Sequence, residues 1–85
     1  IQWIEAVGDY IKIITHKKKF LVLSTMKDFL TRLPQEQFSR IHKSYIINLK
    51  KVINYSSSSV NIENKDFPLS RTQKKQFRLL LSRFQ

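Results

Sequence analysis

Residues 1–23, IQWIEAVGDYIKIITHKKKFLVL, predict three strands joined by two turns. In the middle segment, Tyr10 to Thr15, Lys12 interrupts an apolar, β-branched run, which is the pattern of a half-buried strand. Gly8 is the only glycine in the chain, and it indicates a turn that needs a positive φ or a close backbone approach. We expect the second turn at His16–Lys19, as a solvated hairpin tip. This opening predicts a β-dominated domain.

The rest of the chain adds strands and two helices. Further strands are expected at 38–41, 45–47, 52–55, 60–63 and 66–69, with a hairpin loop at 56–59 and a tight turn at 64–65. A first helix is expected within STMKDFLTRLP, residues 24–34, capped by Thr25 and ended by Pro34. A second helix is expected from Ser70, which forms a capping box with Gln73. The total is about seven strands, with no internal repeat and no βαβ alternation.

The apolar residues of the two helices predict where the core lies. Met26, Phe29, Leu30 and Leu33 recur at helical spacing, and Phe77, Leu80, Leu81 and Phe84 form the apolar face of the second helix. We assign Trp3 and most of the phenylalanines to the core. Because no exposed aromatic ladder is then left, the pattern argues against a protein that binds single strands by stacking.

Length and composition restrict the class of protein. The 85 residues predict one domain, 1–85, and the abrupt strand-like start predicts a fragment of a longer protein. The chain has no cysteine, which excludes disulfides and thiolate zinc sites. It has no apolar run of membrane-spanning length and no signal peptide. We therefore expect a cytoplasmic protein without a membrane partner.

The charge balance indicates the partner. Sixteen Lys and Arg against six Asp and Glu give a net charge of +10. Such a field attracts polyanions: DNA, RNA or an anionic membrane. Three classes follow: a double-stranded DNA-binding protein, an RNA-binding β domain, and a basic module that binds protein or membrane surfaces.

We expect no enzyme, no cofactor and no metal site. His16 and His42 lack acidic partners at metal-ligand spacing. The chain has no nucleophile-elbow motif and no phosphate-cradling glycine loop, and its carboxylates are scattered.

Two basic clusters at junctions between elements are the candidate binding residues. The first is Arg40-Ile41-His42-Lys43-Ser44, and the second is Ser70-Arg71 with Lys74 and Lys75 on the following helical turns. Charges and hydroxyls position a protein on phosphates, whereas a few extended side chains, Arg above all, contact base edges. His42 has a structural alternative, fixing its turn by hydrogen bonds. Asn48 is expected to tie a strand end to a neighbouring backbone.

Three ordered motifs resemble those of the LytTR DNA-binding domain family. They are FSRIHKSYIINL at 38–49, FPLSR at 67–71 and IEAVGDY at 4–10, and the first helix ending in Leu-Pro matches as well. The resemblance covers nearly the whole chain, and three motifs at family spacing are more specific than any one of them. Since LytTR domains carry additional residues before I-E-A, the resemblance implies that a first strand is missing here.

The resemblance implies a compact, largely antiparallel β domain with two short helices. It also implies sequence-specific binding of double-stranded DNA by a bacterial transcription regulator, as the output domain of a two-component response regulator. Loops, not a recognition helix, would enter successive major grooves. The implied partners are DNA, an upstream receiver domain in the full-length protein, and a second copy on paired DNA repeats.

The family's base-contacting positions fall on Lys43, on Arg71 and on the loop after I-E-A. In that loop Asp9, Tyr10 and Lys12 all remain candidates, although Asp9 would be repelled by phosphate and is expected to shape the turn or to accept from a cytosine amino group. The other polar residues of the two clusters are expected to contact phosphates or support the base readers: Arg40, His42, Ser44, Lys74 and Lys75.

Overall fold

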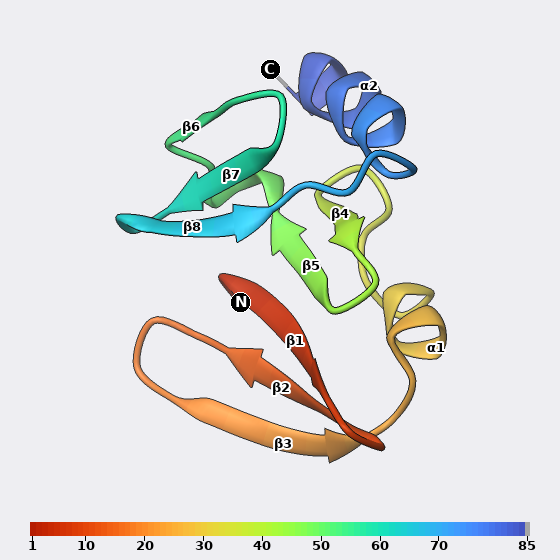
Figure 1. The fold of residues 1–85 in the computed structure, drawn as a ribbon. Helices are drawn as coiled ribbons and strands as arrows, with labels where there is room; N and C mark the ends of the chain where they lie inside the picture. Colours follow the sequence, from red (N-terminus) through yellow and green to blue (C-terminus); the bar gives the residue numbers. More distant parts are fainter. Residues whose placement is uncertain (85) are drawn as a thin grey trace.

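The computed structural model describes residues 1–84 and consists of short strands with two α-helices (Figure 1). In chain order the elements are β1 (Trp3–Val7), β2 (Tyr10–Ile14), β3 (Lys19–Leu23), α1 (Met26–Leu30), β4 (Phe38–His42), β5 (Tyr45–Asn48), the 3-10 turn η1 (Leu49–Lys51), β6 (Asn54–Tyr55), β7 (Ser59–Ile62), β8 (Lys65–Pro68) and α2 (Lys74–Phe84).

The strands form two antiparallel sheets. The larger has the order β3-β2-β1-β5-β4, and the smaller has the order β6-β7-β8. In Figure 1 the small sheet lies above the large one, α2 covers the top, and α1 lies beside the large sheet. The mainly β, largely antiparallel class with two short helices is confirmed.

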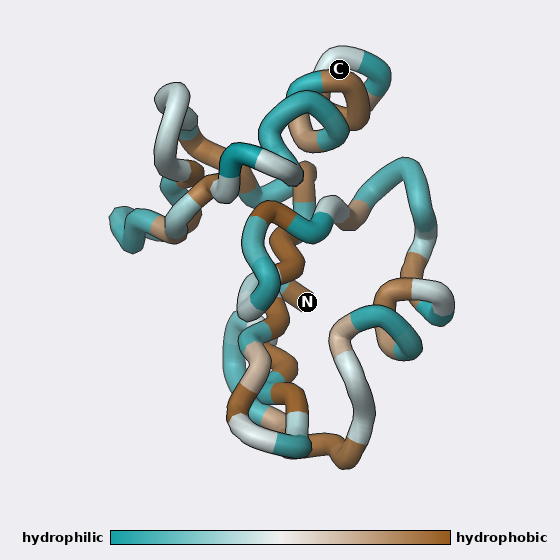
Figure 2. Tube along the Cα trace, turned by 45° about the vertical axis from the view of Figure 1, so that its right-hand side comes forward, coloured by the Kyte–Doolittle hydropathy of each residue, from teal (hydrophilic) through white to brown (hydrophobic). Residues whose placement is uncertain are grey.

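Each face of the large sheet contributes to a different core. Ile4, Ile13 and Ile46 are register partners, so they share one face, and they pack with Met26 of α1. Trp3 and Ile47 share the opposite face, which packs against Phe67 of the small sheet. That second core extends to α2 through Phe77 and Leu81. Figure 2 shows the apolar segments along the strands and the hydrophilic ones in the connecting loops.

Both helices are shorter than the sequence predicted. Thr25 caps α1 as expected, since its hydroxyl accepts from the Asp28 N–H, but α1 ends at Leu30 rather than at Pro34. The predicted cap of α2 by Ser70 is wrong, because the helix begins at Lys74. Ser70 instead donates its backbone N–H to the Ile41 carbonyl oxygen at 2.7 Å, so the loop before α2 is held against β4.

The turns follow the predictions with two corrections. Gly8 has a φ of +60°, as expected. The expected hairpin loop is present, but it covers Ser56–Ser58 rather than 56–59, because Ser59 begins β7. The tight turn is Glu63–Asn64 rather than 64–65, since Ile62 pairs with Lys65 and both turn residues have positive φ. The predicted strand 52–55 is reduced to β6, Asn54–Tyr55, because Val52 caps η1, and the described chain has eight strands.

Not all aromatic side chains join the core. Phe20 is 47% exposed and Phe84 is 38% exposed, whereas the other four phenylalanines lie in or against the core, in agreement with the expectation that most of them do. Within residues 1–84, neither helix has the length and apolar character needed to cross a membrane.

Candidate nucleic-acid interface

Three connections that are far apart in the sequence lie in one row. The Ala6 N–H donates to the Ser44 carbonyl oxygen at 2.9 Å, which places the β4–β5 turn beside the end of β1. The bond from Ser70 to Ile41 places the loop before α2 beside the other end of the same turn. In Figure 1 the β1–β2 turn lies at the bottom, the β4–β5 turn in the middle and the loop before α2 at the top. We call residues 8–10, 42–44 and 70–75 the three-loop surface.

The turn that carries Lys43 is held by side chains of its own hairpin. The Arg40 guanidinium donates through Nη2 to the Lys43 carbonyl oxygen at 2.7 Å and through Nε to the His42 carbonyl oxygen at 3.4 Å. The Ser44 N–H donates to Nδ1 of His42 at 3.1 Å. A register shift between Arg40 and His42 gives the strand its extra residue here. The backbone at Lys43 is therefore fixed, whereas its side chain is exposed.

Arg71 lies in the loop before α2, in an exposed position. Among residues 1–84, no hydrogen bond or ion pair occupies its guanidinium. Lys74 and Lys75 follow on the first turn of α2, where the unpaired N–H groups of the helix also favour an anion. Charges that are unpaired in the free protein are available to a polyanion without breaking an internal contact.

Tyr10 and Lys12 occupy different places, although both lie on β2. Tyr10 directly follows the Gly8–Asp9 turn, which is part of the three-loop surface, and is 45% exposed. Lys12 lies further along β2, half-buried, opposite Glu5 of β1 and Leu21 of β3. Of the candidates after I-E-A, Tyr10 therefore lies closer to the row of turns.

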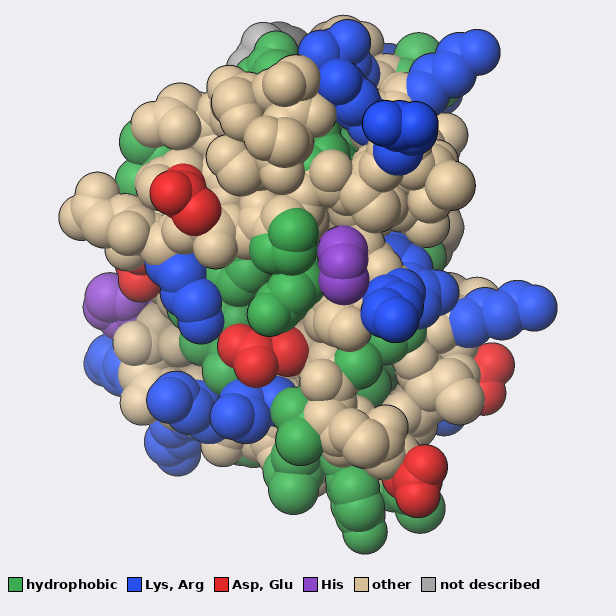
Figure 3. Space-filling model, viewed as in Figure 1, with side chains coloured by type: hydrophobic (Ala, Val, Ile, Leu, Met, Phe, Trp, Pro, Cys, Tyr) green, Lys and Arg blue, Asp and Glu red, His purple; other side chains and the backbone are tan. Residues whose placement is uncertain are grey.

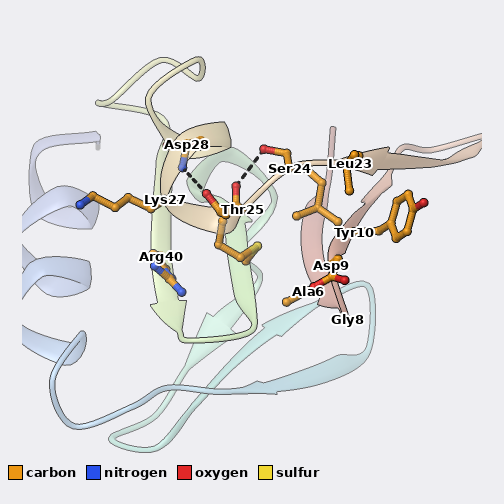
Figure 4. Close-up of a pocket in the computed structure, with 12 residues that line it drawn as sticks. Ala6, Gly8, Asp9, Tyr10, Leu23, Ser24, Thr25, Lys27, Asp28 and Arg40 are labelled. Carbon is orange, nitrogen blue, oxygen red and sulfur yellow. Dashed lines mark hydrogen bonds between the residues drawn. The ribbon is translucent and has the colours of Figure 1, made fainter.

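A hollow of about 530 Å³ borders the three-loop surface. In Figure 4, Asp9 and Tyr10 of the β1–β2 turn lie on one side of it, and the start of α1 and Arg40 lie on the other. The lining carries Lys27 and Arg40 together with Asp9 and Asp28, so charges of both signs meet here. The sequence did not indicate this hollow, because its walls come from segments that only the fold brings together.

The excess of positive charge that the sequence shows is not neutralised by ion pairs within the fold. The only ion pair within residues 1–84 joins Lys65 to Glu5 at 3.9 Å, so most of the sixteen cationic side chains have no internal counter-charge. The Lys65 ammonium also lies 5.3 Å from the ring centroid of Trp3 and 5.2 Å from that of Phe67, which gives it a structural role. Figure 3 shows Lys and Arg side chains at the top, at the right edge and at the lower left of this face.

The fold brings the two predicted basic clusters together and confirms two structural roles. His42 fixes its turn through Nδ1. The Asn48 amide donates to the Ile1 carbonyl oxygen at 2.7 Å and accepts from the Lys50 N–H at 3.0 Å, as expected for a strand-end tie. No cluster of metal-ligating side chains occurs in the part of the chain that the structure describes. The assignments of individual residues to bases or phosphates stay predictions.

Comparison with known proteins gives one family. The family model of the LytTr DNA-binding domain matches residues 1–82. The chain is 26% identical over 88 residues to the transcriptional regulatory protein YpdB of Escherichia coli O6:H1, covering 95% of this chain and 36% of that protein. It thus spans about a third of that relative's length. The fold is similar to the LytTr DNA-binding domain of a methyl-accepting/DNA response regulator from Bacillus cereus, with a TM-score of 0.84, 22% identity, and coverage of 95% of this chain and 80% of that one.

Proposed function

Because this chain belongs to the LytTR family of DNA-binding domains of transcription regulators, we propose that its three-loop surface binds double-stranded DNA in a sequence-specific manner and reads bases in the major groove. One observation supports this proposal: the Ser70–Ile41 hydrogen bond joins the loop that carries Arg71 to β4, the strand that leads into the turn of Lys43. Both side chains are exposed. The loop of Arg71 is tied to β4 through the Ser70 N–H, and the Lys43 carbonyl oxygen accepts from Arg40 of its own hairpin.

The size of the domain supports contact with successive grooves. Its longest Cα extent is 31 Å. Successive major grooves on one face of B-DNA are about 34 Å apart. The domain is therefore about as long as this spacing, and long side chains add several ångströms at each end.

We assign base contacts to Lys43 and Arg71, with Tyr10 preferred over Lys12 for the third contact. An Arg fork matches N7 and O6 of guanine, and Lys can donate to the same acceptors. Lys74 and Lys75 serve as phosphate contacts at the start of α2.

The hydrogen bonds narrow the roles of Arg40, His42 and Ser44. Arg40 donates twice to the turn, so its role is to support Lys43. The Ser44 N–H donates to Nδ1 of His42. Nε2 of His42 and the Ser44 hydroxyl therefore remain for phosphate contacts.

At the level of the whole protein, we propose the output domain of a bacterial two-component response regulator. The names of the two similar proteins, a transcriptional regulatory protein and a response regulator, support this. A receiver domain would precede residue 1, the regulator would act in the cytoplasm, and two copies would occupy paired DNA repeats. We assign no catalytic step to this domain.

A competition titration tests the proposal against its rivals. A labelled duplex bound by the domain is competed with random duplex, single-stranded DNA, A-form RNA and liposomes that contain anionic lipid. Sequence-specific DNA binding predicts that unlabelled specific duplex competes best and random duplex second. An RNA-binding domain predicts that A-form RNA or single strands compete better. A membrane-surface module predicts that liposomes compete in proportion to their anionic lipid.

A further inference from the structure

The hydrogen bond between His42 and Ser44 defines the protonation state of the imidazole. Nδ1 accepts the Ser44 N–H at 3.1 Å, and a ring nitrogen can accept only when it carries no proton. The ring is therefore neutral in this arrangement, with its proton on Nε2. Nδ1 stands in the position that the side-chain oxygen of Asn takes when it accepts from the N–H two residues ahead.

Uptake of a second proton would remove this acceptor. Nδ1–H and the Ser44 N–H would then be two hydrogen-bond donors that face each other, so the ring would have to rotate away from this position. The charged groups on the adjoining backbone are cationic. Lys43 follows His42 directly, and Arg40, whose register partner Ile46 lies on the other face of the sheet, donates through Nε to the His42 carbonyl oxygen at 3.4 Å. The ring also packs on Tyr45, with centroids 5.7 Å apart.

No carboxylate on the packed elements is free to compensate. Glu5 of β1 lies on the same face as His42, beyond Tyr45, since both are register partners of that tyrosine. Its carboxylate already accepts from Nε1 of Trp3 at 2.9 Å and pairs with Lys65. Protonation of His42 would thus add a positive charge to a turn that Lys43 already makes cationic, while releasing one of the bonds that hold this turn.

We propose that His42 is a positioning residue for Lys43, that it acts through the neutral Nε2–H tautomer, and that protonation of its ring releases the turn. This inference rests on the proposed base contact by Lys43. It predicts that acidification changes two properties of DNA binding in opposite directions. Affinity for random duplex rises because a cation is added, whereas the preference for the specific duplex falls because Lys43 is no longer held.

Two amide variants separate the two ring nitrogens. In His42→Asn the side-chain oxygen replaces Nδ1 as the acceptor of the Ser44 N–H. Because an amide takes up no proton in this pH range, the turn keeps its acceptor on acidification. In His42→Gln the amide lies one bond further out, near the position of Nε2, and cannot replace Nδ1. The matched control is His16→Asn, because His16 lies at the exposed β2–β3 hairpin tip.

The measurement is the ratio of the dissociation constants for random and specific duplex, compared at about pH 8 and, after acidification, at about pH 5.5. For the wild type and His16→Asn, this ratio should fall roughly two- to ten-fold on acidification, which corresponds to the free energy of one hydrogen bond. His42→Asn should keep it at both pH values, and His42→Gln should have the low ratio at both. An equal ratio for the two amide variants at about pH 8 would overturn the proposal.

A second measurement needs no DNA. Long-range proton–nitrogen NMR of the free domain identifies the tautomer, and the Ser44 amide signal reports its hydrogen bond. We expect unprotonated Nδ1 at about pH 8 and a Ser44 amide shift that follows the titration of His42. A proton on Nδ1 at that pH, or a Ser44 amide insensitive to the titration, refutes the inference. A domain that passes this test but prefers no duplex refutes the proposed function instead.

Discussion

The backbone N–H of Ser70 lies 2.7 Å from the carbonyl oxygen of Ile41 and donates to it. This bond joins two segments that each looked like an isolated basic cluster in the sequence. Ser70 does not cap α2, which begins at Lys74. Arg71 and Lys43 consequently belong to one surface, and the DNA-binding predictions follow from that arrangement.

Replacing Arg71 with Ala should remove a base contact. We expect a loss of about 1–3 kcal/mol on the preferred duplex, with little change on random duplex. Fluorescence anisotropy titrations of both duplexes at one fixed salt concentration measure this. Arg78→Ala is the matched control, because Arg78 is an exposed arginine of α2 outside the three-loop surface. If both variants lose affinity equally on both duplexes, Arg71 is a phosphate contact.

Replacing Lys74 with Ala should weaken binding to all duplexes by a similar factor. A phosphate contact carries no sequence information and releases condensed counterions when it forms. The slope of log affinity against log salt should therefore decrease in magnitude by about one unit. The check is a series of titrations from low to moderate salt, with Lys17→Ala at the β2–β3 hairpin tip as control. A slope that Lys74→Ala leaves unchanged would exclude the phosphate contact.

Asn48→Ala should destabilise the fold. The Asn48 side chain is buried, and its amide ties β5 to Ile1, to Lys50 and, at 3.3 Å, to Gln37. We expect a loss of about 1–3 kcal/mol in the free energy of unfolding. Urea denaturation followed by circular dichroism measures it. Asn54→Ala, at an exposed position of β6, should stay within about 0.5 kcal/mol of the wild type. Equal stability of the two variants would contradict this account.

Gly8→Ala tests backbone conformation without a steric clash. Gly8 has a φ of +60°, and no atom lies within 4 Å of the place where a Cβ would stand. The expected loss of about 1–2 kcal/mol comes from the left-handed backbone alone. Gly8→Asn should lose less, since Asn tolerates this region better than Ala does. Thermal unfolding of the three proteins gives the order, and an Ala variant as stable as the wild type would show that the turn relaxes.

The sequence predicted the strands well because alternation and turn residues are local signals. Val60 and Ile62 alternate with polar residues, and Gly8 marks its own turn. The start of α2 could not be predicted from local signals: Ser70 has the right side chain for a cap, but in the fold its hydroxyl lies 3.3 Å from Thr72 Oγ1 and the helix begins at Lys74. The end of α1 was predicted too late because Pro34 marks a latest possible end, not the actual one.

For the candidate site, the sequence indicated which residues are basic, but not which of them are already engaged in hydrogen bonds within the protein. Arg40 and Lys43 look equivalent in the chain, whereas in the fold Arg40 holds the turn and Lys43 extends from it. Lys65 likewise gave no sign of its position beside the Trp3 and Phe67 rings. Such differences arise from pairings between distant strands, which a pattern of residue types does not contain.

Selection from a random duplex library tests the central claim most directly, that Lys43 and Arg71 read bases side by side. The wild-type domain should enrich one motif. Arg71→Ala should lose the preference at one base pair of that motif, and Lys43→Ala should lose it at a different base pair, with the remaining positions unchanged. If the wild type enriches no motif, or if both variants enrich the unaltered wild-type motif, the account is wrong.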